Sequence, residues 1–211
     1  MDLALSKHMF RAGSEPLVKK INNRCRMSIM QRLQKMLPEE YGEVKRDCVF
    51  SHVLAIGENE LGYSGTLIHS FLSRQLVTSK LHELWFVFAR IPLRFSEQEL
   101  HAIIGLKFKV EEVFDFDNWK DDMDFWSKLL NRSKNISLKM IKKEHLKHVH
   151  KWTYVDRVRL IYVCLIAGVL IAKDEKGNIP HAYIKMVMDI DKLQRYPCYS
   201  FMFSCFTLYS L

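Results

Sequence analysis

The amino-acid sequence predicts a mainly α-helical (α+β) fold, a single helical domain with a small two-stranded hairpin near residues 84–95. Hydrophobic residues make up 48% of the 211-residue chain and recur at helical spacing over most of it, as expected for a packed domain. Two short apolar runs, Leu84–Ala89 and Leu93–Phe95, have the length and separation of paired strands. The uncharged stretch Leu160–Ala172 is shorter than the ~20 apolar residues that span a bilayer, so it predicts a buried core helix.

The first third of the chain is predicted to hold short helices. Residues 1–26 are mixed and basic, and predict an arm or a weakly packed helix. Apolar residues at helical spacing predict a helix over 28–37, which Pro38 would end. Two further short helices are expected over 47–56 and 66–76, with glycines in the loop between them.

The helix after the hairpin has the clearest start and stop signals. Ser96 and Glu99 form a capping box, in which the serine hydroxyl accepts from the N–H three residues on and the glutamate reaches back. Gly105 suits the left-handed conformation that ends many helices. A helix is therefore expected between Ser96 and Gly105.

Three more helices are expected before residue 172. Aromatic residues over 115–131 predict a helix with an aromatic inner face. Over 138–152 the apolar positions step by three or four and leave lysines on the outside. Thr153, with Asp156 three residues later, is expected to open the central helix, which runs to about Ile171.

A polar turn then leads to a last helix, expected from Pro180 to Leu193. The chain is thus divided into an N-terminal arm with the first helix (1–40), a main domain (41–197) and an atypical tail (198–211). The tail is apolar and carries no charge, which is typical of a translated intron or a shifted reading frame. We expect the chain to be a fragment of a longer gene product.

The net charge of +8 is concentrated in one part of the chain. The window Lys128–Arg159 holds ten basic and two acidic residues, whereas Glu111–Asp124, just before it, holds seven acidic residues and one basic. A basic window of this strength can meet nucleic-acid phosphate, an acidic partner protein or its own acidic neighbour.

The five lysines on the outside of the 138–152 helix are the one functional candidate: Lys139, Lys142, Lys143, Lys147 and Lys151. A row of lysines can neutralise phosphates and release counterions. No aromatic side chain lies between them to stack a base, so only non-specific nucleic-acid contact is expected. A solvated face, or internal pairing with the acidic segment, is the stronger alternative.

The evidence for metal or cofactor chemistry is weak, and we expect neither. His145 and His148 would share a helix face, but no further ligands have matching spacing, and His145 falls on the apolar stripe at the edge of the core. The acidic residues over 115–124 are better explained by the dipole at a helix start than by a cation site.

The compartment is expected to be reducing, either nuclear or cytoplasmic. The five cysteines are odd in number, widely spaced and without a C-x-x-C pair, and the N-terminus lacks the continuous apolar region of a signal peptide. No membrane association is expected.

Several short segments, in order and spacing, carry a resemblance to a known family. They are Leu84–Phe88, Pro92–Ser96 with Glu99, Gly105-Leu106, Phe125-Trp126 with Leu129-Leu130, Asp156-Arg157, Leu160–Tyr162, Gly168–Leu170 and Tyr196-Pro197. Over about 41–197 the chain resembles the plant family known as domain of unknown function 1985. Relatives usually have glycine in the hairpin turn, where this chain has Ala89-Arg90-Ile91, so a looser hairpin is expected.

The resemblance implies a largely helical, plant-restricted domain, often associated with mobile elements and often N-terminal to a SUMO-type cysteine protease domain. It implies no catalytic residue within the domain itself. The protease would need a histidine, an aspartate and a glutamine shortly before a cysteine in a glycine-rich setting. Asp47-Cys48 is the nearest local match and lacks both the glutamine and the glycines, so Cys48 is expected to be a buried or half-buried structural residue.

These observations favour a non-enzymatic accessory or interaction domain, with weak non-specific affinity for nucleic acid or for an acidic protein. The alternative is the regulatory or targeting part of a SUMO-specific protease-like protein, whose catalytic domain is absent from this chain.

Overall fold

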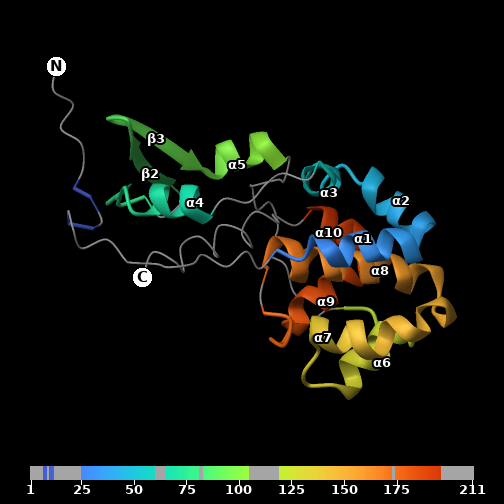
Figure 1. Ribbon diagram of the computed structural model, residues 1–211. Coiled ribbons are helices and arrows are strands. Elements are labelled where there is room, and N and C mark those ends of the chain that lie inside the picture. The colour runs from blue at the N-terminus through green and yellow to red at the C-terminus, as the bar shows by residue number, and fades with distance from the viewer. Residues whose placement is uncertain are drawn as a thin grey trace.

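A computed structural model describes residues 7–8, 10–11, 25–59, 65–80, 83–104, 119–172 and 174–195. The described part is mainly helical and includes a small antiparallel sheet, which confirms the predicted fold class. Figure 1 shows a bundle of helices and, beside it, the sheet with two short helices. Gly105, the segment 111–118 and the tail 198–211 lie outside the described residues.

Three helices open the bundle: α1 (Met27–Met36), α2 (Pro38–Arg46) and α3 (Ser51–Glu58). The first matches the helix expected over 28–37. Pro38 ends α1 as expected, but it also starts α2, a helix that was not predicted from the sequence. Proline suits the first position of a helix because its missing N–H would have no partner there, and Glu39 and Glu40 favour the same end through the helix dipole.

The sheet has three strands in the order β1-β2-β3, with both pairs antiparallel. The elements of this part are α4 (Gly65–Leu72), β1 (Gln75–Leu76), β2 (Glu83–Phe88), β3 (Ile91–Ser96) and α5 (Glu97–Ile104). The predicted hairpin is confirmed as β2 and β3. The sheet has one strand more than this hairpin. Strand β1 occupies the end of the segment predicted as a helix over 66–76, so that helix prediction is wrong beyond Leu72.

The hairpin turn is tight, not loose. Phe88 pairs with Ile91, which leaves a two-residue turn of Ala89 (φ 48°) and Arg90 (φ 66°). Two-residue turns of this kind need positive φ at both positions to match the twist of the strands. The chain adopts that conformation without glycine, and the cost is local backbone strain.

The capping box is present in a modified form. The backbone N–H of Ser96 donates to Oε2 of Glu99 at 2.8 Å, as predicted. The hydroxyl of Ser96 accepts from the N–H of Gln98 at 3.2 Å, two residues on and not three.

The remaining helical elements are α6 (Phe125–Arg132), α7 (Leu138–Met140), a π-helical turn η1 (Ile141–His145), a 3₁₀ turn η2 (Leu146–Lys151), α8 (Tyr154–Leu165), a second π-helical turn η3 (Ile166–Leu170), α9 (His181–Val187) and α10 (Ile190–Arg195). Of the helix expected over 115–131, the described part begins at Phe125, because the aspartates between residues 119 and 125 form turns. Asp121 accepts from the N–H of Met123, and Asp122 from that of Asp124. The last helix, expected to be continuous, breaks between α9 and α10.

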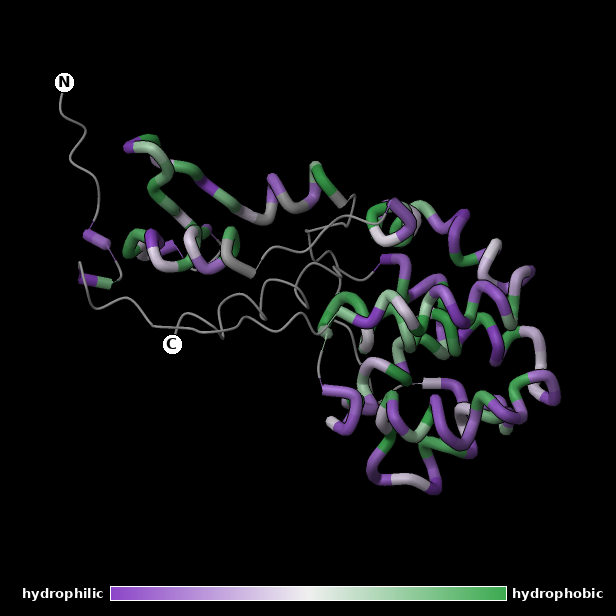
Figure 2. The backbone as a smooth tube through the Cα atoms, in the orientation of Figure 1, coloured by the Kyte–Doolittle hydropathy of each residue, from purple (hydrophilic) through white to green (hydrophobic). Residues whose placement is uncertain are grey.

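The central position predicted for the helix after Thr153 is confirmed. The hydroxyl of Thr153 accepts from the N–H of Asp156 at 3.2 Å and caps α8. From Val158 to Gly168 every residue is buried. Figure 2 shows this hydrophobic stretch within the bundle, and helix α1, which precedes residue 41, packs into the same core through Ile29, Met30 and Leu33. The folded unit therefore includes α1.

Candidate basic interaction surface

The five predicted lysines lie along one helical run made of α7, η1 and η2. The side-chain hydroxyl of Ser137 starts this run by accepting from the N–H of Met140 at 3.2 Å. The run is not a regular α-helix, so its side chains do not follow one straight stripe. Lys143, Lys147 and Lys151 are exposed, whereas Lys139 and Lys142 are half-buried.

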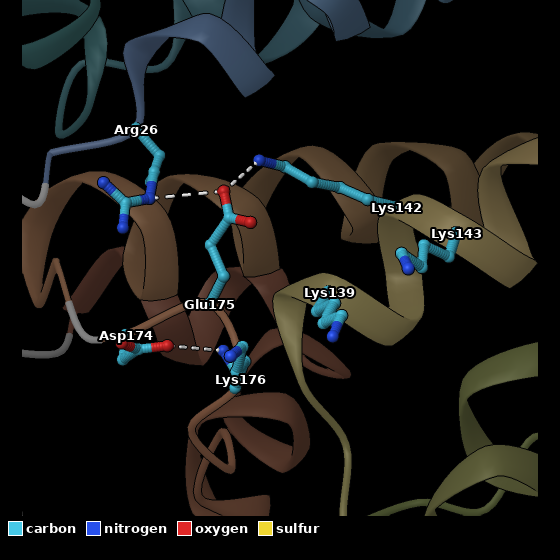
Figure 3. A pocket seen from close by; sticks show the side chains of 7 residues that line it. All are labelled: Arg26, Lys139, Lys142, Lys143, Asp174, Glu175 and Lys176. Atoms are coloured by element: carbon cyan, nitrogen blue, oxygen red, sulfur yellow. Dashed lines mark hydrogen bonds and ion pairs between the residues drawn. The ribbon is translucent and has the colours of Figure 1, made fainter.

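Lys142 differs from the other lysines because it is paired. Its Nζ lies 2.5 Å from Oε1 of Glu175, and the Nε of Arg26 lies 3.2 Å from the same oxygen. Figure 3 shows the carboxylate of Glu175 between these two cationic groups. The hydrogen bond from Lys142 opposes the effect of partial burial and lowers the pKa of Glu175 below its usual value. Glu175 is therefore a stable anion at neutral pH.

A concave site of about 310 Å³ surrounds this ion-pair cluster. We call it the Glu175 cavity. It is lined by five basic residues and two acidic ones, Arg26, Lys139, Lys142, Lys143, Lys176, Asp174 and Glu175. The excess of positive charge makes the cavity suitable for an anion.

Main-chain hydrogen bonds bring these distant segments together. The N–H of Arg26 donates to the carbonyl of Gly168 at 2.7 Å, and the N–H of Lys139 donates to the carbonyl of Glu175 at 2.9 Å. Helical spacing predicted that Lys139, Lys142 and Lys143 lie together. No local pattern indicated the other basic residues of the cavity, Arg26 and Lys176, or the carboxylate of Glu175. The polar turn that includes Glu175 was visible, but nothing in its spacing indicated a contact with residue 26 or 142.

The acidic segment Glu111–Asp124 is described only from residue 119. There, Asp121 accepts from the side chain of Asn131 at 3.0 Å, and Asp122 pairs with Arg159 at 2.5 Å. Neither carboxylate reaches the five lysines. Within the described residues the acidic partner of this lysine run is Glu175, while the part of the segment before residue 119 lies outside them.

The expected environment of Cys48 is wrong, since the residue is exposed. Its neighbour Asp47 is buried and points to the core, where it accepts from the hydroxyl of Tyr162 at 2.6 Å. Residues 47 and 48 face opposite ways at the end of α2, and the sequence alone does not show which of the two points to the core.

His145 lies at the edge of the core as predicted. Its ring is 5.1 Å from that of Phe125 and 6.4 Å from that of Trp152, and burial lowers its pKa. His148 is exposed, so the two histidines do not converge. No group of three or more metal-ligating side chains occurs in the described ranges.

Comparison with known proteins gives one result. Searches of curated proteins and of solved structures find no significant match. Among the described residues, no helix is both long and apolar enough to cross a membrane. One family model matches residues 72–207. The match starts later than the expected residue 41 and ends beyond the expected residue 197. It therefore includes residues 198–207 of the tail. Because this match covers more than half of the chain, the protein belongs to the family described as a domain of unknown function (DUF1985).

Proposed function

We propose that this protein is a non-enzymatic interaction domain that binds acidic partners, nucleic acid in particular, through Lys139, Lys142, Lys143, Lys147 and Lys151. The observation that supports this most is the state of three of these lysines. Lys143, Lys147 and Lys151 are exposed, and none forms an ion pair with a carboxylate of the described residues. Their charge is therefore available to a partner.

The expected binding is weak and independent of base sequence. Lysine carries a flexible point charge that contacts phosphate without distinguishing the bases beside it. Arginine has the planar group that makes bidentate contacts with guanine. The aromatic residues nearest to the run, Phe125 and Trp152, stack on each other at 3.6 Å between centroids and are half-buried. They are not presented to a base, and base stacking is not expected.

The test is binding of a random-sequence DNA duplex as a function of salt. The parent should bind at low salt, and log K should fall linearly with log salt at about −0.9 per phosphate neutralised. The triple variant Lys143→Glu, Lys147→Glu and Lys151→Glu should lose binding and keep its melting temperature, because these side chains are exposed.

The matched control reverses three exposed charges elsewhere, through Arg32→Glu, Lys35→Glu and Arg46→Glu on α1 and α2. This variant should retain most of its DNA affinity. An equal loss of DNA affinity in both variants would show that net charge alone drives binding. It would contradict binding at the surface formed by the five lysines. A loss of stability in the first variant alone would instead favour internal pairing with the acidic segment.

The second candidate function is the regulatory or targeting part of a SUMO-protease-type protein of plant mobile elements. Only the family resemblance supports it. A nuclear or cytoplasmic location would suit both candidates. The isolated chain should not cleave a SUMO conjugate, and cleavage by the purified chain would contradict a non-enzymatic role.

A further inference from the structure

We propose that the Glu175 cavity is a binding site for a phosphate group, and that Glu175 occupies the phosphate position as a built-in competitor in the free protein. The inference goes beyond the lysine surface and does not depend on nucleic-acid binding. It rests on the arrangement of charges around one oxygen atom, Oε1 of Glu175.

Two of the five basic residues of the cavity already bind an anionic oxygen. Lys142 and Arg26 approach Oε1 at 2.5 and 3.2 Å from different segments of the chain. Ammonium and guanidinium groups bind phosphate oxygens with the same geometry and charge that they use for a carboxylate. A phosphate in place of the carboxylate would keep both contacts and add oxygens for the lysines around it.

Three more cations line the cavity without such a partner. Lys139, Lys143 and Lys176 make no ion pair with a carboxylate of the described residues. The second carboxylate of the cavity, Asp174, accepts from the main-chain N–H of Lys176 at 2.8 Å. The five basic residues still outnumber the two acidic ones, so positive charge remains uncompensated. A phosphate dianion has the charge and the number of oxygens to compensate it.

Arg26 supplies an independent observation. Its Nε is buried and makes no hydrogen bond within the described part of the chain. The contact with Glu175 is therefore an ion pair in which the N–H of Nε does not point at the carboxylate oxygen. A buried donor left without a hydrogen bond is destabilising. A larger anion that reaches deeper beside Arg26 would satisfy this donor.

The site is held in place by the fold while its competitor can leave. The main chain of Arg26 is fixed to Gly168, and that of Glu175 to Lys139. The side chain of Glu175 is 32% exposed and lies in a turn, so it can rotate into solvent without disturbing the core. Displacement of Glu175 therefore requires only a side-chain movement.

The lining also limits what the ligand can be. None of the seven lining residues is aromatic, so nothing in the cavity would stack a nucleobase. A volume of about 310 Å³ is at the lower end of the range for small-molecule sites. Recognition is thus of the phosphate itself, carried either by a small ligand or by a nucleic-acid backbone.

The experiment measures binding of inorganic phosphate to the full chain by calorimetry at constant ionic strength. The parent should bind weakly because Glu175 competes. Glu175→Gln should bind about tenfold more tightly, since it removes a like charge a few ångströms from the phosphate. Adding Arg26→Gln or Lys142→Gln to this variant should reverse the gain.

The matched control is Glu144→Gln, which makes the same charge change at an exposed position outside the cavity. Equal phosphate affinity of the Glu175→Gln and Glu144→Gln variants would overturn the proposal. Retention of the gain after Arg26→Gln would also overturn it, because phosphate would then bind elsewhere.

A measurement on the unaltered protein avoids any folding defect of the variants. Carbon-detected NMR can follow the Glu175 carboxylate during a phosphate titration. Release from Lys142 should raise its pKa toward the usual value, and an unchanged pKa at saturating phosphate would contradict displacement. Competition by duplex DNA for bound phosphate would identify a nucleic-acid backbone as the source, and binding without competition a small phosphorylated ligand.

Discussion

The hydroxyl of Tyr162, in the middle of helix α8, donates a hydrogen bond to Oδ2 of Asp47 at 2.6 Å. Asp47 follows α2 and also accepts from the N–H of Val49 at 2.7 Å and from the side chain of Gln194 at 2.9 Å. Three segments that are far apart in sequence are thus joined at one buried carboxylate. Removal of any donor leaves the charge of Asp47 less well compensated inside the core.

Replacement of Tyr162 by Phe should destabilise the fold by about 1–3 kcal/mol, the usual cost when a buried polar group loses a partner. Denaturant unfolding would measure it. Tyr154→Phe is the matched control, since Tyr154 makes the same kind of bond, to Glu43 at 2.6 Å, on an exposed surface. This exposed bond should contribute little. Equal losses in the two variants would mean that burial of Asp47 is energetically unimportant.

The same pair predicts a loss of stability at high pH. Burial, and then the bond to Asp47, raise the pKa of Tyr162 above its ordinary value of 10.0. A raised pKa contributes stability that is complete below about pH 10 and is lost as the pH rises through the folded-state pKa. Between pH 10 and 11 the free energy of unfolding should therefore fall more steeply in the parent than in Tyr162→Phe. Tyr41, whose pKa is raised to about 12, is present in both proteins and cancels in the difference.

The central helix provides a test of the core. Leu165 is fully buried at the end of α8, where Leu165→Ala would leave a cavity. Such substitutions cost about 2–5 kcal/mol. Val155→Ala in the first turn of the same helix is the control, because Val155 is 46% exposed and should be nearly neutral. A thermal melt of Leu165→Ala that overlays the parent would contradict the placement of α8.

Structural features that depend on neighbouring residues in the sequence were predicted better than tertiary contacts. The hairpin, the cap at Thr153 and the buried α8 follow from residues within a few positions of each other, and all three were confirmed. Strand β1 is two residues long and gives no periodic signal, so it was missed. The restart of the chain as α2 at Pro38 was missed because proline marks both the end and the beginning of a helix.

The candidate site shows the same limit. Helical spacing grouped the lysines, but it could not show that Lys142 is bound by Glu175 while Lys143 is not. The partners come from the segment before α1 and from the turn after η3. Their meeting depends on how α1 packs on η3, which is a property of the whole core and not of any local motif.

The hairpin turn offers a stabilising substitution. Ala89 and Arg90 both have positive φ, a conformation that costs an ordinary residue about 1–2 kcal/mol and that Asn-Gly adopts readily. The double change Ala89→Asn and Arg90→Gly should therefore raise hydrogen-exchange protection in β2 and β3. Ser79→Gly, in an exposed bend without positive φ, is the control and should not stabilise, since glycine there only increases the freedom of the unfolded chain. Lower protection in the double variant would refute this turn geometry.

The capping box predicts an unusual titration. The side chain of Ser96, and then that of Arg94 with a bond of 2.7 Å to Oε1, lower the pKa of Glu99 to about 2. This carboxylate therefore supports the start of α5 above about pH 4.5, and its contribution is lost as the pH falls toward 2. Ser96→Ala should move the pKa of Glu99 back toward its usual value of 4.5, which carbon-detected NMR would show.

Glu175 is the internal control for that titration. Its pKa is also lowered, but by Lys142 in the bundle, so Ser96→Ala should leave it unchanged. Arg94→Gln should raise the pKa of Glu99 by less than Ser96→Ala, because both the N–H and the hydroxyl of Ser96 would remain in contact with the carboxylate. If Glu99 instead titrated at its usual value in the parent, the carboxylate would be in solvent, and the start of α5 would depend on the serine hydroxyl alone.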